Sequence, residues 1–351
     1  MRRCYISRNY KNPGTANGKA KMDIEDIMQG MGFKNIGLTR STHKNKVLDF
    51  ILTLSGIIKA LCLLRPNDIL VLQYPMKKYY EMVCNVAHRR GAKVITLIHD
   101  LGSFRRKKLT VAQEIRRLHH SDVIIVHNEH MKHWLEQQGC QRPLVVLGIF
   151  DYLSAQVPLA ENGSASTQKD AAAQPPYSLS FVGNLSYRQN SFLYELGKHM
   201  THSQLYLYGN RYEEEKGSPA FHYMGFTIDT DLIQHNMGDF GLSWYGNSLE
   251  EGVGDLGEYM NFNNPHKVSL YLRCHTPVIL HTAAGLAAFV KEKGIGICVD
   301  SLTDLEGRLT EVSAEEYSQM RENVKRIALQ LADGHYTRTA IEAAIAQLLN
   351  S

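Results

Sequence analysis

Short apolar runs alternate along the chain with longer segments that mix apolar and charged residues. Three of the runs, Ile69–Gln73, Val94–Ile98 and Val123–Val126, lack alternation with period two, which is typical of strands buried on both faces of a parallel sheet. In the first half of the chain the expected strands are Arg3–Ser7, Ile69–Gln73, Val94–Ile98, Val123–Val126 and Leu144–Ile149. Because helical segments separate them, the pattern predicts a doubly wound α/β domain.

The same pattern starts again after a break in composition. Residues 156–176 are small and polar, which is typical of a linker. The strands expected beyond it are Leu179–Val182, Leu205–Tyr208, Phe240–Ser243 and Val278–Leu280. A chain of 351 residues is also long for a single core. We therefore predict domains at residues 1–155 and 177–330, followed by a terminal helical segment at residues 331–351.

The most hydrophobic stretch is Phe50–Leu64, FILTLSGIIKALCLL. It is shorter than the roughly 20 residues that a membrane span requires, and Lys59 interrupts it. Two interpretations remain open. The stretch forms a helix of the core, or it forms an amphipathic helix that is partly inserted in a membrane interface.

The composition is that of an ordinary globular protein, with 44% apolar and 21% charged residues. The first residues lead into a strand without the apolar region of a signal peptide. The six cysteines are scattered and form no C-x-x-C motif, which favours reduced thiols over disulfides or zinc. We therefore expect a cytoplasmic protein, with the inner face of the plasma membrane as a place of association.

The net charge of +4 hides an asymmetry. Residues 1–150 hold 25 Lys and Arg against 11 Asp and Glu, a net charge of +14, whereas residues 151–351 hold 14 against 24, a net charge of −10. A basic first half needs an anionic partner, and nucleic acid, an anionic membrane or an anionic lipid-linked substrate all qualify. The sequence shows no zinc, RRM-like or helix-turn-helix signature, which makes nucleic acid the weakest of the three.

The most informative stretch is Asn261–Ser301, which reads as loop, helix, strand, helix and strand. Asn264 is a suitable N-cap, and Pro265 suits the first helical position. The helix would then aim the N–H groups of His266 and Lys267 at an anion, and Lys267 would add a full charge. An ordinary capped helix with a solvated lysine is the alternative, but the glycine-rich sequel KEKGIGICVDS favours a functional site.

The motifs NNPHK, SLYLR, TPVI, GIGI and VDS of this stretch resemble the donor-binding half of a group of bacterial GT-B glycosyltransferases. The group includes galactofuranosyltransferases of polysaccharide clusters and second-step glucosyltransferases of streptococcal serine-rich adhesins. Weaker similarity covers NPGTANGKAKMDI near the start, LIHDLGSFR, VHNEHMKHWLEQQG and FVGNL. The resemblance implies two Rossmann-like domains that face a central cleft, a final helix that crosses back to the first domain, and a nucleotide-sugar donor, most often linked to UDP.

His99 and Asp100 follow a predicted strand on the acceptor side of the implied cleft. An inverting transfer needs a group that takes the proton of the acceptor hydroxyl, and Asp100 is the candidate base. His99 would hydrogen-bond to donor or acceptor. The alternative is that Asp100 caps a loop and His99 is structural. The basic run that follows, Arg105, Arg106, Lys107 and Lys108, is either a solvated surface or a site for a diphosphate-lipid acceptor or an anionic membrane.

The remaining expected donor-site residues lie at strand ends and helix starts. Gly183 would let the backbone approach a ligand, and Arg188 would reach a phosphate. The resemblance places the hydroxyl of Thr15 near the donor phosphates and the ring of Tyr208 near the base, although a plain β–α turn and an ordinary strand-end tyrosine are the alternatives. The full predicted set is Thr15, Gly183, Asn184, Arg188, Tyr208, Asn263, Asn264, His266 and Lys267.

No metal or other cofactor is expected. Asp229-Thr230-Asp231 has the letters of a metal motif, but it begins a predicted helix away from the implied cleft. Glu250 and Glu258 have the spacing of the Glu-x7-Glu pair of retaining GT-B enzymes. In that pattern the second acid stands at the helix N-terminus, where this chain has Asn264 and Lys267, and this departure favours inversion.

These observations predict a metal-independent, inverting hexosyltransferase with a UDP-sugar donor. Galactofuranose is the first choice of sugar and glucose the second. The acceptor would be a lipid-linked capsular or exopolysaccharide intermediate, or a glycosylated adhesin. A nucleotide-sugar epimerase of the same fold and a non-catalytic nucleotide-sugar or nucleic-acid binding protein are the alternatives. The sequence leaves open whether the protein is a homo-oligomer.

Overall fold

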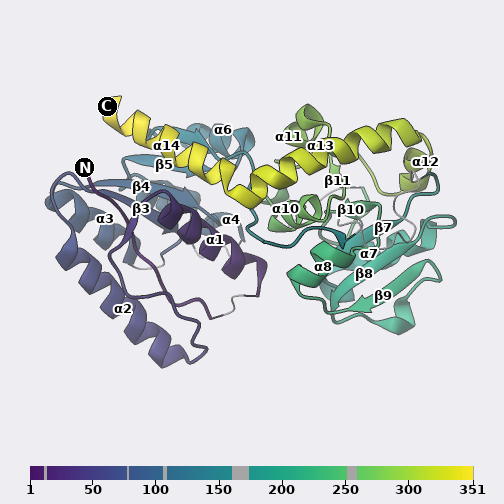
Figure 1. The fold of residues 1–351 in the computed structure, drawn as a ribbon, viewed down its shortest axis with the longest axis horizontal. Helices are drawn as coiled ribbons and strands as arrows, with labels where there is room; N and C mark the ends of the chain where they lie inside the picture. The colour runs from purple at the N-terminus through teal and green to yellow at the C-terminus, as the bar shows by residue number, and fades with distance from the viewer. Residues whose placement is uncertain (12–13, 77–78, 106–108, 160–173, 251–258, 351) are drawn as a thin grey trace. The chain divides into compact units, whose positions relative to one another are not determined.

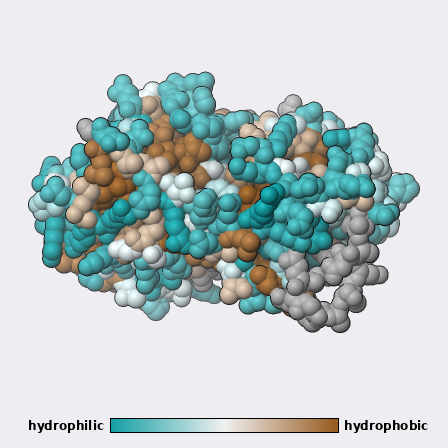
Figure 2. Space-filling model, turned by 45° about the horizontal axis from the view of Figure 1, so that its top comes forward, coloured by the Kyte–Doolittle hydropathy of each residue, from teal (hydrophilic) through white to brown (hydrophobic). Residues whose placement is uncertain are grey.

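The computed structural model describes residues 1–11, 14–76, 79–105, 109–159, 174–250 and 259–350. The chain divides into two compact units. Unit 1 comprises Met1–Asp151 and Gly334–Ser351, and unit 2 comprises Tyr152–Asp333. The surface seen in Figure 2 is largely hydrophilic, and hydrophobic side chains form separate patches on it.

Unit 1 is built on a parallel six-stranded sheet with the order β2-β1-β3-β4-β5-β6. Its strands are β1 (Arg3–Tyr5), β2 (Lys34–Asn35), β3 (Ile69–Tyr74), β4 (Lys93–Ile98), β5 (Val123–Val126) and β6 (Leu144–Val146). Every apolar run predicted in this half forms a strand. The sequence analysis missed β2, because its two residues are polar and exposed.

The helices of unit 1 lie on both faces of this sheet (Figure 1). They are α1 (Ala16–Gly30), α2 (Lys46–Leu63), α3 (Tyr80–Arg89), α4 (Gly102–Arg105), α5 (Val111–Leu118), α6 (Glu129–Gln137) and α14 (His335–Asn350). The stretch that was predicted as a core helix or an interfacial helix lies in α2, which buries Gly56, Ile57 and Ala60 on one side. Among the described residues, no helix is both long and apolar enough to cross a membrane.

The last helix, α14, is part of unit 1. Its Ala340, Ile341 and Ile345 lie in one core cluster with Ile69 of β3 and Ile95 of β4. Asp151, the last residue of the first segment of unit 1, accepts hydrogen bonds from backbone N–H groups in the first turn of α14. One carboxylate oxygen of Asp151 accepts from Thr337 N at 2.6 Å and the other from Tyr336 N at 3.2 Å.

Unit 2 is built on a second parallel six-stranded sheet, with the order β12-β11-β10-β7-β8-β9. Its strands are β7 (Leu179–Asn184), β8 (Leu205–Asn210), β9 (Phe221–Gly225), β10 (Phe240–Leu242), β11 (Val278–His281) and β12 (Gly296–Val299). Its helices are α7 (Tyr187–His199), α8 (Asp229–His235), α10 (His266–Arg273), α11 (Ala287–Lys293), α12 (Leu305–Thr310) and α13 (Ala314–Asp333). The two sheets confirm the predicted α/β class.

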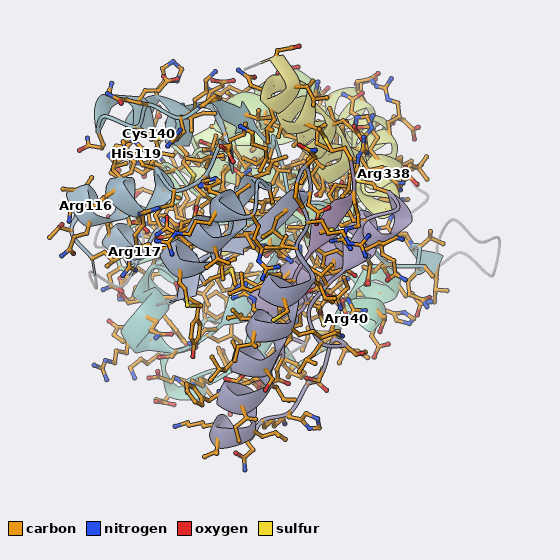
Figure 3. All side chains as sticks on the ribbon, turned by 90° about the vertical axis from the view of Figure 1, so that its left-hand side faces the viewer. Arg40, Arg116, Arg117, His119, Cys140 and Arg338 are labelled. Carbon is orange, nitrogen blue, oxygen red and sulfur yellow. The ribbon has the colours of Figure 1, made fainter. Side chains whose placement is uncertain are left out.

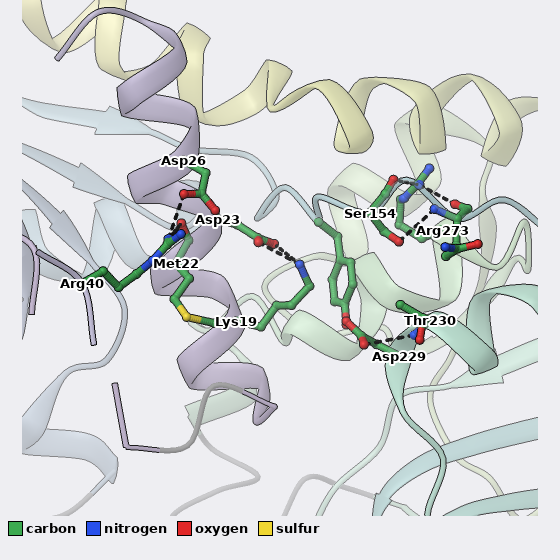
Figure 4. Close-up of polar contacts among 11 residues, drawn as sticks. Lys19, Met22, Asp23, Asp26, Arg40, Ser154, Asp229, Thr230 and Arg273 are labelled. Atoms are coloured by element: carbon green, nitrogen blue, oxygen red, sulfur yellow. Dashed lines mark hydrogen bonds and ion pairs between the residues drawn. The ribbon is translucent and has the colours of Figure 1, made fainter. Parts of the chain in front are cut away.

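The stretch predicted as a linker, residues 156–176, falls within unit 2, and residues 160–173 lie outside the described part. Its first residue is tied to unit 2 by the buried guanidinium of Arg273. That side chain donates to Ser154 O at 2.7 Å, to Gln156 O at 2.9 Å and to Ala328 O at 3.0 Å (Figure 4). The chain passes between the units at residues 151–152 and 333–334 instead.

Candidate functional site

The sheet of unit 2 has a topological switch point between β7 and β10, where the chain changes the side of the sheet on which it adds strands. From β7 the chain adds β8 and β9 on one side, and it then adds β10, β11 and β12 on the other. Ligands of open parallel sheets bind at the carboxyl ends of the strands at such a switch point. The carboxyl ends of β7 and β10 are therefore the place in unit 2 to look for a ligand site.

Beyond their paired residues, β7 and β10 are bridged by a side chain of α10. The ladder joins Leu179 to Phe240 and Ser180 to Gly241. The buried hydroxyl of Tyr271 then accepts from Val182 N at 2.8 Å and donates to Leu242 O at 3.1 Å. A tyrosine hydroxyl thus replaces the backbone ladder, and it fixes α10 against the switch point.

Lys267, in the first turn of α10, places its ammonium group at this switch point. Its Nζ lies 4.3 Å from the ring centroid of Phe181 on β7 and 3.9 Å from that of Tyr245, which follows β10. The residue is only 9% exposed, and within the described part of the chain its Nζ has no hydrogen-bond partner. Two aromatic faces attract a cation but do not replace the hydrogen bonds that water gives it.

Burial lowers the pKa of Lys267 from 10.5 to about 7. The sequence analysis expected a fully charged lysine here, and the structure corrects that expectation. The amine is close to half protonated at neutral pH, and an anion beside it would stabilise the charged form. A buried amine of this kind is a feature of functional sites more often than of solvated surfaces.

Helix α10 begins one residue later than predicted. Pro265 occupies the N-cap position without a side-chain cap, and Asn264 is buried before the helix instead of capping it. The ring of His266 stacks on that of Tyr152, with centroids 4.6 Å apart and planes at 25°. The Tyr152 hydroxyl in turn donates to Asp229 Oδ2 at 3.0 Å. Asp229, the first acid of the Asp-x-Asp sequence, therefore fixes the ring of Tyr152 that packs on His266 of α10 (Asp229 is labelled in Figure 4).

Ser243 is a second buried polar group at the same switch point, and the sequence analysis missed it. It follows β10 directly, and the residue is buried. Its Oγ has no hydrogen-bond partner among the residues that the structure describes. A serine at the end of an apolar run carries no sequence signal, since only the folded structure shows that its hydroxyl is left unsatisfied.

Two glycines stand side by side at the ends of β7 and β8. Gly183 pairs with Gly209 in the ladder, with φ angles of +153° and +158°. A Cβ atom on Gly209 would lie 1.8 Å from the carbonyl oxygen of Gly183, so this position has no room for a side chain. Gly209 thus allows the ends of β7 and β8 to approach each other, and the close approach of a ligand at Gly183 stays a prediction.

The residues after Gly183 shape the turn into α7. Asn184 Oδ1 accepts from Ser186 N at 3.0 Å, and its Nδ2 donates to Gln189 Oε1. The carbonyl of Asn184 accepts from Asn190 Nδ2 at 2.8 Å. Arg188 lies in the first turn of α7 and is exposed. Asn184 thus stabilises the turn between β7 and α7 through its side chain and carbonyl. Arg188 is a solvent-exposed cation next to this turn.

The structure places Tyr208 differently from the expectation. Its ring is buried in a cluster that includes Tyr152, Ile233 and Leu270, and its hydroxyl accepts from Met237 N at 3.1 Å. The residue is only 4% exposed, which leaves little surface on which a base could stack. Asn263 lies in the turn before α10, where its N–H donates to Tyr259 O at 2.9 Å.

In unit 1, His99 and Asp100 follow β4 at the carboxyl edge of the sheet, as the sequence analysis expected from the strand pattern. The ring of His99 is buried and stacks on Phe150 at 5.4 Å, with planes at 8°. Its Nε2 lies 2.7 Å from Gln73 Oε1, while Gln73 Nε2 donates to Lys21 O. The glutamine oxygen therefore faces the ring, and His99 Nε2 is the donor. Asp100 is half-buried at the end of the strand.

A buried carboxylate that the sequence analysis missed holds the segment after Asp100. Glu114 of α5 accepts from Gly102 N at 2.7 Å, from Ser103 N at 2.8 Å and from the Tyr74 hydroxyl at 2.8 Å. An anion at the first amides of α4 is favourable because those N–H groups lack partners within the helix. The sequence feature that could have indicated this role is an acidic residue on the buried side of α5, together with Ile115 and Leu118.

The other predicted residues of unit 1 have local roles or lie beyond the described part. Thr15 is the N-cap of α1, and its Oγ1 accepts from Gly18 N at 3.3 Å. Arg105 is the last residue of α4, whereas Arg106, Lys107 and Lys108 lie outside the described residues. In unit 2, Glu258 also lies outside the described residues.

Comparisons with known proteins match both units. The family model "Glucosyltransferase 3-like, N-terminal domain" matches residues 3–149, and the model of the C-terminal domain matches residues 179–344. The chain is 30% identical over 331 residues to the β-1,6-galactofuranosyltransferase WbbI of Escherichia coli (strain K12), with 94% of each chain covered. The chain belongs to the glucosyltransferase 3-like family.

Two further similarities agree with this membership. The chain is 22% identical over 347 residues to glucosyltransferase 3 of Streptococcus gordonii, with 94% of each chain covered. The crystal structure of Anabaena HepE in complex with UDP-glucose superposes with a TM-score of 0.60 at 11% identity, over 99% of this chain and 100% of that one. The protein is therefore a glycosyltransferase of the GT-B fold, and the predicted resemblance, fold and enzyme class are confirmed.

Proposed function

We propose that this family member is a metal-independent, inverting hexosyltransferase that uses a UDP-sugar as donor. The observation that carries the proposal is the buried ammonium of Lys267 at the switch point of the unit 2 sheet, with no hydrogen-bond partner among the described residues. A diphosphate would supply the negative charge and the acceptor oxygens that this group lacks. HepE, which has a similar fold, was crystallised with UDP-glucose, which supports the same class of donor.

The diphosphate must leave with an extra negative charge when its bond to the sugar breaks. Lys267, the first-turn amides of α10 at His266 and Lys267, and the exposed Arg188 would stabilise that charge as it develops. Asn263 and Asn264, which precede the helix, would orient sugar or phosphate oxygens. Fixed positive charge would thus take the part that a divalent ion plays in other transferases.

The acceptor hydroxyl must lose its proton as its oxygen attacks the anomeric carbon. We assign this proton transfer to Asp100, because its carboxylate stands at the end of β4 on a segment that Glu114 holds in place. His99, fixed through Gln73, would position the reacting groups. Attack from the side opposite to the leaving diphosphate inverts the anomeric carbon.

The similar proteins guide the choice of substrates. The 30% identical relative is named for a β-1,6-galactofuranosyl transfer, which favours galactofuranose over glucose as the donor sugar. For the acceptor we favour a lipid-linked glycan intermediate of surface polysaccharide synthesis, because unit 1 carries the basic segment Arg105–Lys108. Such an acceptor would bring the enzyme to the inner face of the plasma membrane.

The proposal is tested by calorimetric titration with UDP, GDP, UDP-glucose, UDP-galactose and UDP-galactofuranose in the absence of metal. We expect UDP compounds to bind and Lys267→Met to weaken them about 10- to 100-fold, since a hydrogen bond to a charged group contributes about 1.5–3 kcal/mol. The matched control is Lys198→Met, which removes an exposed lysine of the same unit and should leave binding unchanged.

Asp100→Asn separates binding from chemistry. This variant should bind the donor as the wild type does and transfer no sugar, in an assay that follows release of UDP with a lipid-linked acceptor. A failure of every nucleotide to bind would refute the donor site, and normal transfer by Asp100→Asn would remove that residue as the base.

A further inference from the structure

Helix α2 carries an apolar stripe on its outer side. Val47, Ile51, Leu54 and Ile58 follow the spacing i, i+4, i+7 and i+11, which aligns them along one side of a helix. Val47 is 68% exposed, Ile51 51% and Ile58 54%. In Figure 3, α2 lies in front of the other elements of unit 1, and no other helix or strand is drawn over it.

The concentration of such side chains on one element is unusual for this protein. Six of the 16 exposed large hydrophobic side chains among the described residues belong to α2, namely Val47, Leu48, Phe50, Ile51, Ile58 and Leu63. Single exposed apolar residues need no explanation, but a contiguous apolar patch marks a surface that meets a partner or a membrane.

The charges around the stripe indicate which partner. Lys44 and Lys46 stand at the start of α2, Lys59 stands on the helix, and Arg65 follows it; all four are exposed. The single acid between residues 43 and 65 is Asp49, which pairs with Lys11 at 2.7 Å. Arg90 adds a cation at the far end, where it donates to the carbonyl of Cys62. An apolar stripe within a basic rim matches an anionic lipid surface.

We propose that α2 binds an anionic bilayer in the plane of the interface, with the stripe inserted among the acyl chains and the basic rim at the headgroups. The helix has 18 residues but is not apolar enough to be a candidate membrane span, which fits a helix that lies on the surface. The inference deepens the proposed function and rests on it for one point, the lipid-linked nature of the acceptor. Binding through α2 would hold unit 1 at the membrane that contains such an acceptor.

The test is co-sedimentation of the full chain with vesicles of phosphatidylcholine alone and of phosphatidylcholine mixed with phosphatidylglycerol. The wild type should bind the mixed vesicles at low salt. The triple variant Val47→Ser, Ile51→Ser, Ile58→Ser should lose at least about tenfold in partitioning. Lys44→Glu with Lys46→Glu should abolish the preference for phosphatidylglycerol while leaving the stripe intact.

The matched control is Phe226→Ser with Ile228→Ser, which removes side chains that are 64% and 53% exposed on unit 2. Its partitioning should equal that of the wild type. The inference is overturned if the wild type does not bind anionic vesicles, or if the control loses as much as the triple variant. It is also overturned if light scattering shows a dimer that the triple variant dissociates, since the stripe would then be covered by a second copy.

Titration of the same proteins with UDP in solution distinguishes a failure of the membrane inference from a failure of the proposed donor site. UDP binding by the triple variant, unchanged from the wild type, shows that the variant is folded and that only the membrane contact was altered. Loss of vesicle binding without loss of UDP binding is the expected result. Vesicle binding without any UDP binding would support the membrane inference and refute the donor site.

Discussion

At the scale of single residues, surroundings decide the chemistry more than residue type does. Arg188 and Lys267 were both expected at donor phosphates. Arg188 is exposed, whereas Lys267 is enclosed by Phe181 and Tyr245. Because water cannot reach its Nζ, the amine of Lys267 loses charge near neutral pH, and a bound anion would restore it.

This linkage predicts proton uptake when a nucleotide binds. The pKa of Lys267 is about 7 in the free protein, and a bound diphosphate would raise it. At pH 8 the amine is mostly neutral before binding and charged afterwards, so up to about one proton should be taken up for each UDP bound. Affinity should therefore fall as the pH rises above 7.

The measurement is calorimetry at pH 8 in two buffers with different ionisation enthalpies. The difference in observed heat between the buffers should disappear in Lys267→Met and persist in Lys198→Met. Equal proton uptake by the wild type and Lys267→Met would show that another group titrates on binding.

At the scale of elements, apolar patterns located the long strands and helices, and local polar contacts set their ends. Strands β2 and β9 were missed because they lie at sheet edges with largely exposed residues. Pro265, not Asn264, takes the N-cap position of α10, and Asn264 is buried before the helix. Such ends depend on what surrounds the first turn, and they vary by a residue or two even between definitions.

The start of α14 shows an element end that depends on pH. Burial raises the pKa of Asp151 from 3.8 to about 6, despite the N–H groups of Tyr336 and Thr337 that it accepts. A group with a raised folded-state pKa stabilises the fold below its unfolded pKa, and this contribution is lost as the pH rises through 6. The loss is about 3 kcal/mol between pH 4 and pH 7, from a difference of roughly two pKa units.

We therefore expect the free energy of unfolding of unit 1 to fall over this pH range in the wild type and to fall less in Asp151→Asn. Urea denaturation of both proteins at pH 4.5 and pH 7.5, followed by circular dichroism, measures the difference. Identical pH slopes in the two proteins would mean that Asp151 does not control the docking of α14.

At the scale of the whole molecule, the chain returns to its first unit after building the second. Helix α14 completes the core of unit 1, where Ile341 is fully buried beside strands that lie far earlier in the sequence. Unit 1 is therefore complete only when the last residues have been added. The matched N-terminal family model ends at residue 149 and does not include this helix.

Removal of core volume from α14 should destabilise unit 1. Ile341→Ala should lower its free energy of unfolding by about 2–5 kcal/mol, whereas Leu349→Ala, on the exposed side of the same helix, should change it by less than about 0.5 kcal/mol. The chain has two tryptophans, Trp134 in unit 1 and Trp244 in unit 2. In a Trp244→Phe background, the fluorescence of Trp134 reports the unfolding of unit 1 alone. Equal effects of the two substitutions would show that α14 is not part of this core.

The sequence by itself determined the α/β class and the buried strands, and it predicted Lys267 as a site residue, because periodicity and local propensity depend only on neighbouring residues. The family also followed from local motifs between Asn261 and Ser301. Only the tertiary structure decided that Lys267 and Ser243 are buried at a switch point, that Tyr208 belongs to the core, and that Glu114 holds the segment after Asp100. Each of these depends on contacts between residues far apart in the chain. Burial and hydrogen-bond satisfaction are properties of such contacts, and no local pattern encodes them.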